Sequence, residues 1–332
     1  MALRFNSSAA VSRETGDELG GAIVGEAASG ASAAWPQQRI FASLLGATSA
    51  AVNETWFVNQ AITSGSEQGI AWRCAGDLLY GVLELDEADF PGSADCSSLQ
   101  AASREAYSRI FRLLDARGFP NLWRVWNYLA AINLEIRGLE RYRQFNVGRQ
   151  DAFLEYRRGA AGNVPAACAL GLASGPLSIA FMAGRVPAVP LENPRQVSAY
   201  NYPADYGPRS PTFSRAALAY PSGQEILLIS GTASIVGHRT VHLNDVAGQC
   251  RECVANIEAV LGEANRLRRS APFVLGELSY RVYLRDAADF RTIREILSRL
   301  LGPAEICYVQ ADICRCDLLL EIEAHALHLL EN

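Results

Sequence analysis

The pattern of apolar and polar positions in the first half of the chain predicts strands on either side of a helix. Residues 97–116 place apolar side chains at helical spacing, and Ser97 or Ser98 stands where an N-cap is expected. The predicted order is β-prone segments at 40–58 and 78–85, the helix at 97–116, a strand at 122–132 and a helix that begins within 134–142.

The second half repeats the helix-then-strand order. Asn244 or Asp245 caps a helix that runs to about Arg268, and a strand covers 278–284. The strand WRVWNYLAAIN, from Trp123, and the segment SYRVYLRDAADF, from Ser279, share Arg-Val in an apolar context and each is followed by a helical segment. We therefore predict a duplicated α+β unit. The first predicted domain, 1–35, is an Ala-, Gly- and Ser-rich N-terminal extension with at best weak strand signals. The first half of the duplicated unit covers 36–160 and the second half covers 161–332.

The segment 318–324 (LLLEIEA) carries Glu321 and Glu323 two positions apart. Alternate side chains of a strand share a face, so both carboxyls point the same way, with Cα atoms roughly 6.5–7 Å apart. If that face is covered, burial and the neighbouring charge raise the pKa, and one glutamate holds a proton that it can donate. An antiparallel strand with one face in water accommodates two exposed glutamates as well, and the strand alone favours that second interpretation.

A proline-rich segment lies between the halves. Its centre reads YNYPADYGPRSPTFSRA from Tyr200, and this spacing of prolines excludes a helix. The segment is either an ordered loop that lines a pocket for an anionic ligand or a connector fixed by its aromatic side chains. In the apolar strand 225–235 that follows, Gly231 either lets a ligand approach the backbone or forms an ordinary bulge.

Composition narrows the chemistry. A net charge of −5 and a pI near 5.5 argue against nucleic acid as the main partner. The chain has no lysine, so all 30 basic residues are arginine. Lysine Schiff bases and phosphate-loop lysines are thereby excluded, whereas arginine suits small carboxylates. No apolar run approaches the ~20 residues of a membrane span, and a secretory signal pattern is missing. We therefore expect a cytoplasmic protein with no membrane association, whose eight cysteines are reduced.

Residue types that bind metals lack the context of a metal site. His238 and His242 lie in a stretch that reads as extended, with no third ligand nearby. Two cysteine pairs are present, Cys250-x-x-Cys253 on a predicted helix and Cys314-x-Cys316 on a predicted strand. Because both pairs lack zinc-knuckle turns, we predict buried structural thiols and no metal. Neither a G-x-S-x-G elbow nor a glycine-rich nucleotide motif is present.

Four stretches resemble the chorismatase family, whose fold is related to the RidA-like (YjgF) proteins. They are RYRQFNVGRQDAF from Arg141, AYNYPADYGPRSPTFSRA from Ala199, LLISGTASIVGHRTVHLNDVAGQ from Leu227 and VQADICRCDLLLEIEA from Val309. The resemblance implies an α+β fold of two RidA-like halves in tandem, the first degenerate and the second carrying most of the active site. It also implies cleavage of the enolpyruvyl ether of chorismate, with release of pyruvate and without metal or cofactor.

The same resemblance assigns roles to individual residues. Glu321 becomes the general acid, because an enol ether reacts only once its methylene carbon is protonated. Tyr206 is assigned to ligand contact, and three arginines are assigned to the carboxylates of chorismate, namely Arg149, Arg209 and Arg215. Arg209 holding the proline-rich loop is the alternative.

Two further residues are similar to those of hydroxybenzoate-forming members. They are Cys314, seven residues before Glu321, and Ala233 in the GTxS stretch. The predicted product is therefore 3-hydroxybenzoate, alone or with 4-hydroxybenzoate. The alternatives are a member that forms 3,4-dihydroxycyclohexa-1,5-dienoate and a RidA-like protein that binds small keto or imino acids. The sequence is compatible with a monomer or a small homo-oligomer.

Overall fold

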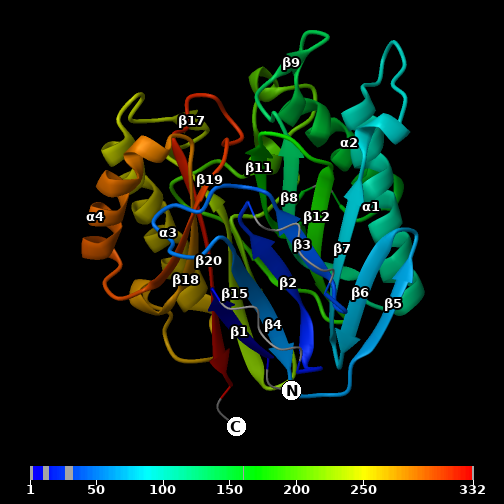
Figure 1. Cartoon of the computed structure of the whole chain (residues 1–332), viewed down its shortest axis with the longest axis horizontal. Coiled ribbons are helices and arrows are strands. Elements are labelled where there is room, and N and C mark those ends of the chain that lie inside the picture. The colour runs from blue at the N-terminus through cyan, green and yellow to red at the C-terminus, as the bar shows by residue number, and fades with distance from the viewer. Residues whose placement is uncertain (1–2, 10–14, 27–32, 160, 331–332) are drawn as a thin grey trace.

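The computed structural model describes residues 3–9, 15–26, 33–159 and 161–330. In this part of the chain, three larger sheets face a common interior, and helices cover the outer sides of two of them (Figure 1). The first sheet has the strand order β1 (Leu3–Ser8), β4 (Val52–Val58), β2 (Glu18–Val24), β3 (Gln37–Ile40).

The second and third sheets each have six strands. The second has the order β11 (Ala166–Leu172), β8 (Asn121–Ala130), β12 (Leu177–Gly184), β7 (Leu78–Leu85), β6 (Ile70–Ala75), β5 (Thr63–Glu67). The third has the order β13 (Val189–Leu191), β14 (Ala216–Ala219), β15 (Gln224–Thr232), β20 (Leu320–Leu329), β18 (Ser279–Leu284), β19 (Glu305–Gln310).

The two six-stranded sheets contain the same topological unit twice. In the first copy, β12 lies antiparallel between β7 and β8, and β8 pairs in parallel with β11. In the second copy, β20 lies antiparallel between β15 and β18, and β18 pairs in parallel with β19. A helix precedes β8, β11, β18 and β19 in turn: α1 (Ser98–Arg117), α2 (Arg141–Glu155), α3 (Val246–Leu267) and α4 (Phe290–Leu300). The predicted α+β fold with two halves in tandem is thus confirmed.

The buried apolar side chains are distributed according to this arrangement of sheets and helices. The outer face of the second sheet packs against α1 and α2, and that of the third sheet against α3 and α4. The inner faces of all three sheets share one core, to which the first sheet contributes Trp56, the second Trp126 and the third Tyr283. An interior lined by three sheets places side chains from distant parts of the chain side by side.

The helix starts agree with the predicted caps. The Ser97 hydroxyl accepts a hydrogen bond from the Gln100 backbone N–H at 3.1 Å, so Ser97 rather than Ser98 is the N-cap of α1. The Asp245 carboxylate does the same for the Gly248 N–H at 2.9 Å at the start of α3. None of the helices in the described part of the chain combines the length and apolar character of a membrane-crossing helix.

Two expectations differ from the structure. The stretch 134–140 is a short hairpin of β9 (Glu135–Ile136) and β10 (Leu139–Glu140), and α2 begins only at Arg141. Its turn contains Arg137 and Gly138 with φ of 56° and 73°, a left-handed conformation that no α-helix continues through. The predicted N-terminal extension contains β1 and β2.

The predicted domain boundaries remain predictions, and hydrogen-bonded sheets cross both of them. The first sheet pairs β2 with β3 and β4, across position 35. The second sheet includes β11 and β12, which lie beyond position 160.

Candidate active site

The two glutamates of β20 point into the protein interior. Leu320 and Ile322, on the other face of the strand, pack in the core beneath α3, so the alternation of the strand turns Glu321 and Glu323 inward. Their exposed fractions are 3% and 5%. The interpretation of a strand with one face in water is therefore wrong.

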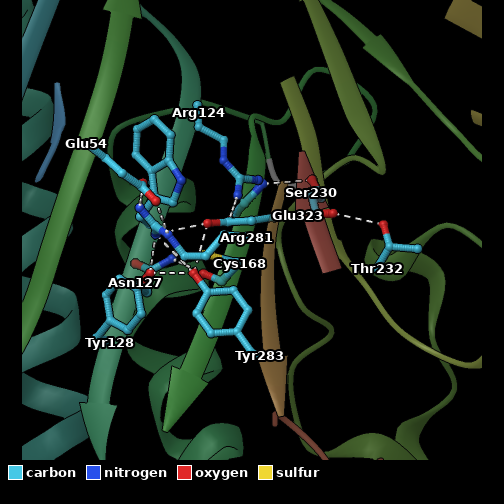
Figure 2. Close-up of polar contacts among 12 residues, drawn as sticks. Glu54, Arg124, Asn127, Tyr128, Cys168, Ser230, Thr232, Arg281, Tyr283 and Glu323 are labelled. Atoms are coloured by element: carbon cyan, nitrogen blue, oxygen red, sulfur yellow. Dashed lines mark hydrogen bonds and ion pairs between the residues drawn. The ribbon is translucent and has the colours of Figure 1, made fainter. Parts of the chain in front are cut away.

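Glu323 is held by charged and polar partners from the second and third sheets (Figure 2). Its carboxylate accepts hydrogen bonds from the Tyr283 hydroxyl at 2.8 Å and from Arg281 Nη1 at 3.0 Å, and it forms an ion pair with Arg124. Arg281 forms a second ion pair with Glu54 of β4. We call these four ionised side chains the buried ion network: Glu54, Arg124, Arg281 and Glu323. Its two carboxylates and two guanidinium groups balance in charge.

Glu321 has no such partner. No described residue forms an ion pair or side-chain hydrogen bond with its carboxyl. Burial raises its pKa to about 8, with a further contribution from the charge of Glu323, while Arg124 and Arg215 act in the opposite direction. At neutral pH, Glu321 is therefore mostly a protonated acid.

Gly231 makes room for this carboxyl. The pairing of β15 with β20 is irregular between Ile229 and Thr232, so Gly231 lies in a bulge, which is one of its two sequence-based interpretations; the approach of a ligand stays a prediction. A Cβ atom at Gly231 would collide with the carboxylate oxygen of Glu321 and would stand 3.2 Å from Cβ of Cys168.

A cavity of about 430 Å³ opens beside Glu321, within the range of small-ligand pockets. It lies between α2, β11, the proline-rich segment, the end of β15 and the turn before β20. It brings together six of the seven predicted site residues: Arg149, Tyr206, Arg215, Ala233, Cys314 and Glu321.

Two of these residues present unused hydrogen-bond donors. Arg149 donates from Nη2 to Asn146 Oδ1 at 2.8 Å, and its buried Nε–H has no partner. Arg215 donates from Nη2 to the Tyr202 hydroxyl and the Val197 carbonyl, each at 2.8 Å, and its buried Nε–H is likewise unpaired. Both arginines line the cavity, where a guanidinium group suits a ligand carboxylate.

Arg209 lies away from this group. It does not line the cavity, and its half-exposed side chain forms an ion pair with Asp151 of α2 at 3.4 Å. The structure thus places Arg209 where it holds the proline-rich segment against α2, which is the alternative named above. Tyr206 does line the cavity, and its hydroxyl lies 3.2 Å from His238 Nδ1.

Three thiols line the cavity, those of Cys168, Cys314 and Cys316, and two of them are neutral groups. Burial raises the pKa of Cys314 to about 12, with a further contribution from Glu321. Burial also raises the pKa of Cys168, a cavity residue that sequence reasoning missed. Cys314 and Cys316 lie in the turn before β20, so their predicted place on a strand is wrong. Cys316 is exposed, contrary to the prediction of a buried thiol, whereas Cys250 and Cys253 are fully buried on α3.

The histidines do not share a strand face. His238 lies in the turn between β16 (Ile235–Val236) and β17 (Arg239–Thr240), and His242 has a left-handed φ of 58° beyond β17. Among the residues that the structure describes, no group of three or more His, Cys, Asp or Glu side chains is arranged to hold a metal ion.

Several further residues line the cavity that sequence reasoning did not single out. Besides Cys168 they include Glu140, Tyr142, Arg143, Tyr202 and Arg315. Tyr142 lies seven residues before Arg149 on α2, a helical spacing that places both on one face and that was available from the sequence. Arg315 stands between Cys314 and Cys316, and the sequence pattern of that stretch pointed only to its thiols.

Because Glu321 is protonated, the free energy of unfolding should depend on pH. Its folded-state pKa, about 8, lies above the ordinary value of 4.5. Its contribution to stability is therefore fully present below pH 4.5 and is lost as the pH rises to 8. Glu321→Gln, which does not ionise, should gain stability relative to the wild type over this window, by up to roughly 5 kcal/mol. Urea unfolding of both proteins at pH 5, 7 and 9 measures this.

The matched control is Glu135→Gln, at an exposed glutamate of β9. Its stability difference from the wild type should stay constant with pH. A constant difference for Glu321→Gln as well would show that Glu321 is ionised in the folded protein at pH 5.

Comparisons with known proteins agree with this fold and identify the family. Residues 54–183 match the family model "Chorismatase FkbO/Hyg5-like, N-terminal". A chorismatase of Streptomyces rapamycinicus is 39% identical over 280 residues, which cover 81% of this chain and 80% of that protein. A 3-hydroxybenzoate synthase of Streptomyces hygroscopicus is 36% identical over 283 residues, covering 81% and 80%. A chorismatase crystal structure at 1.08 Å resolution superposes with a TM-score of 0.86 at 32% identity, covering 98% of each chain. The chain belongs to the chorismatase family.

Proposed function

We propose that this chain cleaves the enolpyruvyl ether of chorismate to pyruvate and 3-hydroxybenzoate, alone or with 4-hydroxybenzoate, and that Glu321 is the general acid. The observation that carries the proposal is a buried, protonated carboxyl on the wall of a 430 Å³ cavity, without an ion-pair or side-chain hydrogen-bond partner among the described residues. The relatives named chorismatase and 3-hydroxybenzoate synthase support the same substrate and product.

The chemistry begins with a proton transfer. Glu321 gives its proton to the methylene carbon of the enolpyruvyl group, and the carbon attached to the ether oxygen becomes an oxocarbenium ion. Water adds to that carbon with loss of a proton, and the resulting hemiketal breaks its bond to the ring oxygen, which leaves as the ring alcohol while pyruvate forms. An acid with a pKa of about 8 is mostly protonated at pH 7 and is returned to that state after each turnover.

The two arginines suit the charge of the substrate. Chorismate carries two carboxylates, and two arginines, Arg149 and Arg215, line the cavity. One guanidinium lies on α2 of the first half and the other at the start of β14 in the second half. We infer that they bind one carboxylate each and orient the enolpyruvyl group toward Glu321.

Cys314 and Ala233 support the aromatic product. Both line the cavity together with Glu321. Hydroxybenzoate and pyruvate together contain the same atoms as chorismate, so a water that adds must leave again, whereas the diol product retains it. A neutral thiol exchanges a proton with the ring oxygen as that oxygen leaves, and the small side chain of Ala233 leaves space for the ring to rearrange.

The alternative of a keto-acid-binding protein is less well supported. A ligand the size of pyruvate has a single carboxylate and would engage only one of the two cavity arginines. The size of the cavity also exceeds what such a ligand fills.

Pyruvate release tests the proposed acid. With chorismate as substrate and lactate dehydrogenase as the coupled reporter, the wild type should release pyruvate and Glu321→Gln should lose at least ~10²–10⁴ of the rate. Because the acid must hold its proton, the wild-type rate should be constant below pH 7 and fall about tenfold per pH unit above pH 8. Glu135→Gln should match the wild type. Wild-type rates in a folded Glu321→Gln would remove Glu321 from the mechanism.

Product analysis tests the thiol. Chromatography of the ring product should show hydroxybenzoate from the wild type and a marked shift to the non-aromatic diol in Cys314→Ala, with pyruvate release retained. The control is Cys96→Ser, at a half-buried thiol that does not line the cavity. An unchanged product ratio in Cys314→Ala would show that the thiol does not select the product.

A further inference from the structure

Arg315 occupies a central place at the rim of the cavity. Three segments form this rim: the proline-rich segment with Tyr202 and Tyr206, the β16–β17 hairpin, and the turn 314–317. Arg315 belongs to the turn and reaches the other two. The centre of its guanidinium lies 4.1 Å from the ring centroid of Tyr206 and 5.3 Å from that of Tyr202. Both distances are within the range of favourable cation–π contacts.

The same guanidinium is tied to the hairpin. Its Nη1 donates to the His238 carbonyl at 3.0 Å and lies 3.4 Å from the Thr240 hydroxyl. The backbone of Arg315 is fixed in turn, because its carbonyl accepts from Arg285 Nη2 at 2.9 Å and Arg285 forms an ion pair with Asp312. Arg315 therefore joins two rim segments from an anchored base.

The contacts continue to a proposed substrate-binding residue. The Tyr202 hydroxyl accepts from Arg215 Nη2 at 2.8 Å, and the Tyr202 and Tyr206 rings lie 5.2 Å apart. Moving the tyrosines would remove the hydrogen bond that orients the Arg215 guanidinium. Because Arg315 contacts both tyrosine rings, its position also affects the orientation of the Arg215 guanidinium.

The charge of Arg315 acts on the nearby Glu140 carboxyl, whose pKa it lowers against the effect of burial, but the two groups form no ion pair. No carboxylate of the described residues lies within ion-pair distance of its guanidinium, whereas the neighbouring Arg143 pairs with Glu140 at 3.5 Å. Asp317, which also lines the cavity, accepts from the Thr240 hydroxyl at 3.1 Å instead. An unpaired, half-buried cation at the rim favours a dianionic ligand.

We propose that Arg315 is a positioning residue: it clamps Tyr202 and Tyr206 over the cavity, holds Arg215 in its binding orientation and adds positive charge at the entrance. This role rests on the proposed function. Arg315 acts on binding rather than on the proton transfer, since the acid lies on β20 and the donors of Arg315 serve the hairpin.

The first test separates binding from chemistry. In the pyruvate assay, Arg315→Ala should raise KM roughly tenfold, equivalent to about 1.4 kcal/mol, with kcat within about threefold of the wild type. Arg315→Lys keeps the charge but loses the planar group that reaches two rings and the hairpin, so its KM should lie in between. The control is Arg299→Ala, at an exposed arginine of α4.

The second test needs no substrate. Hydrogen exchange of the backbone amides should become faster over 199–207 in Arg315→Ala and stay unchanged over the core strands β15 and β20, which also shows that the variant is folded. Wild-type KM, or wild-type exchange over 199–207, would overturn the proposal, as would a fall in kcat at constant KM. If the wild type released no pyruvate, the proposed function would fail, and the exchange measurement would still decide whether Arg315 clamps the rim.

Discussion

The active site depends on the neutralisation of Glu323. Charges buried away from water are tolerated only when they are paired, and here Arg124 and Arg281 both bind the Glu323 carboxylate while Glu54 balances the second guanidinium (Figure 2). With its neighbour ionised and paired, Glu321 is left with burial and a nearby negative charge, and the uncharged acid is its stable form. A buried ion pair is weak evidence for stability, and we interpret the network as the cause of the protonation state of Glu321.

The register of the two copies shows why only the second copy of the unit carries the glutamate pair. Arg124 of β8 and Arg281 of β18 occupy equivalent places in the two copies of the unit. In the second copy, Arg281 pairs in register with Glu323, and Tyr283 with Glu321. In the first copy the corresponding strand β12 offers Met182 and Ala180 instead, opposite Arg124 and Trp126. The first copy has lost the acids but still supplies cations, with Arg124 for the network and Arg149 for the proposed substrate site.

The sequence predicted the elements whose signals are local. The Ser97 cap and the repeated strands depend on neighbours in the chain, and the glutamate pair was recognisable from a two-residue spacing. The exposure of that pair was not predictable, because it depends on the first and second sheets covering the face of β20 that carries the two glutamates. Strands β1 and β2 were missed since their stability comes from pairing with β4 rather than from their own composition.

The roles of the arginines were the hardest to predict from the sequence. Thirty arginines look alike along the chain, and Arg209 was assigned to a substrate carboxylate by resemblance to the family, yet it binds Asp151 outside the cavity. Arg124 and Arg281 were visible as part of the repeat, but nothing local showed that both converge on Glu323. Only the three-sheet interior brings those residues together, across separations of about 200 and 40 positions.

The central claim is that Glu321 carries a proton at neutral pH, and infrared difference spectroscopy of the wild type against Glu321→Gln tests it most directly. The account predicts the carbonyl band of one protonated carboxyl group at pH 6.5, present in the wild type, absent from the variant, and lost from the wild type by pH 9.5. A wild-type spectrum at pH 6.5 without that band, with the protein folded, would contradict it.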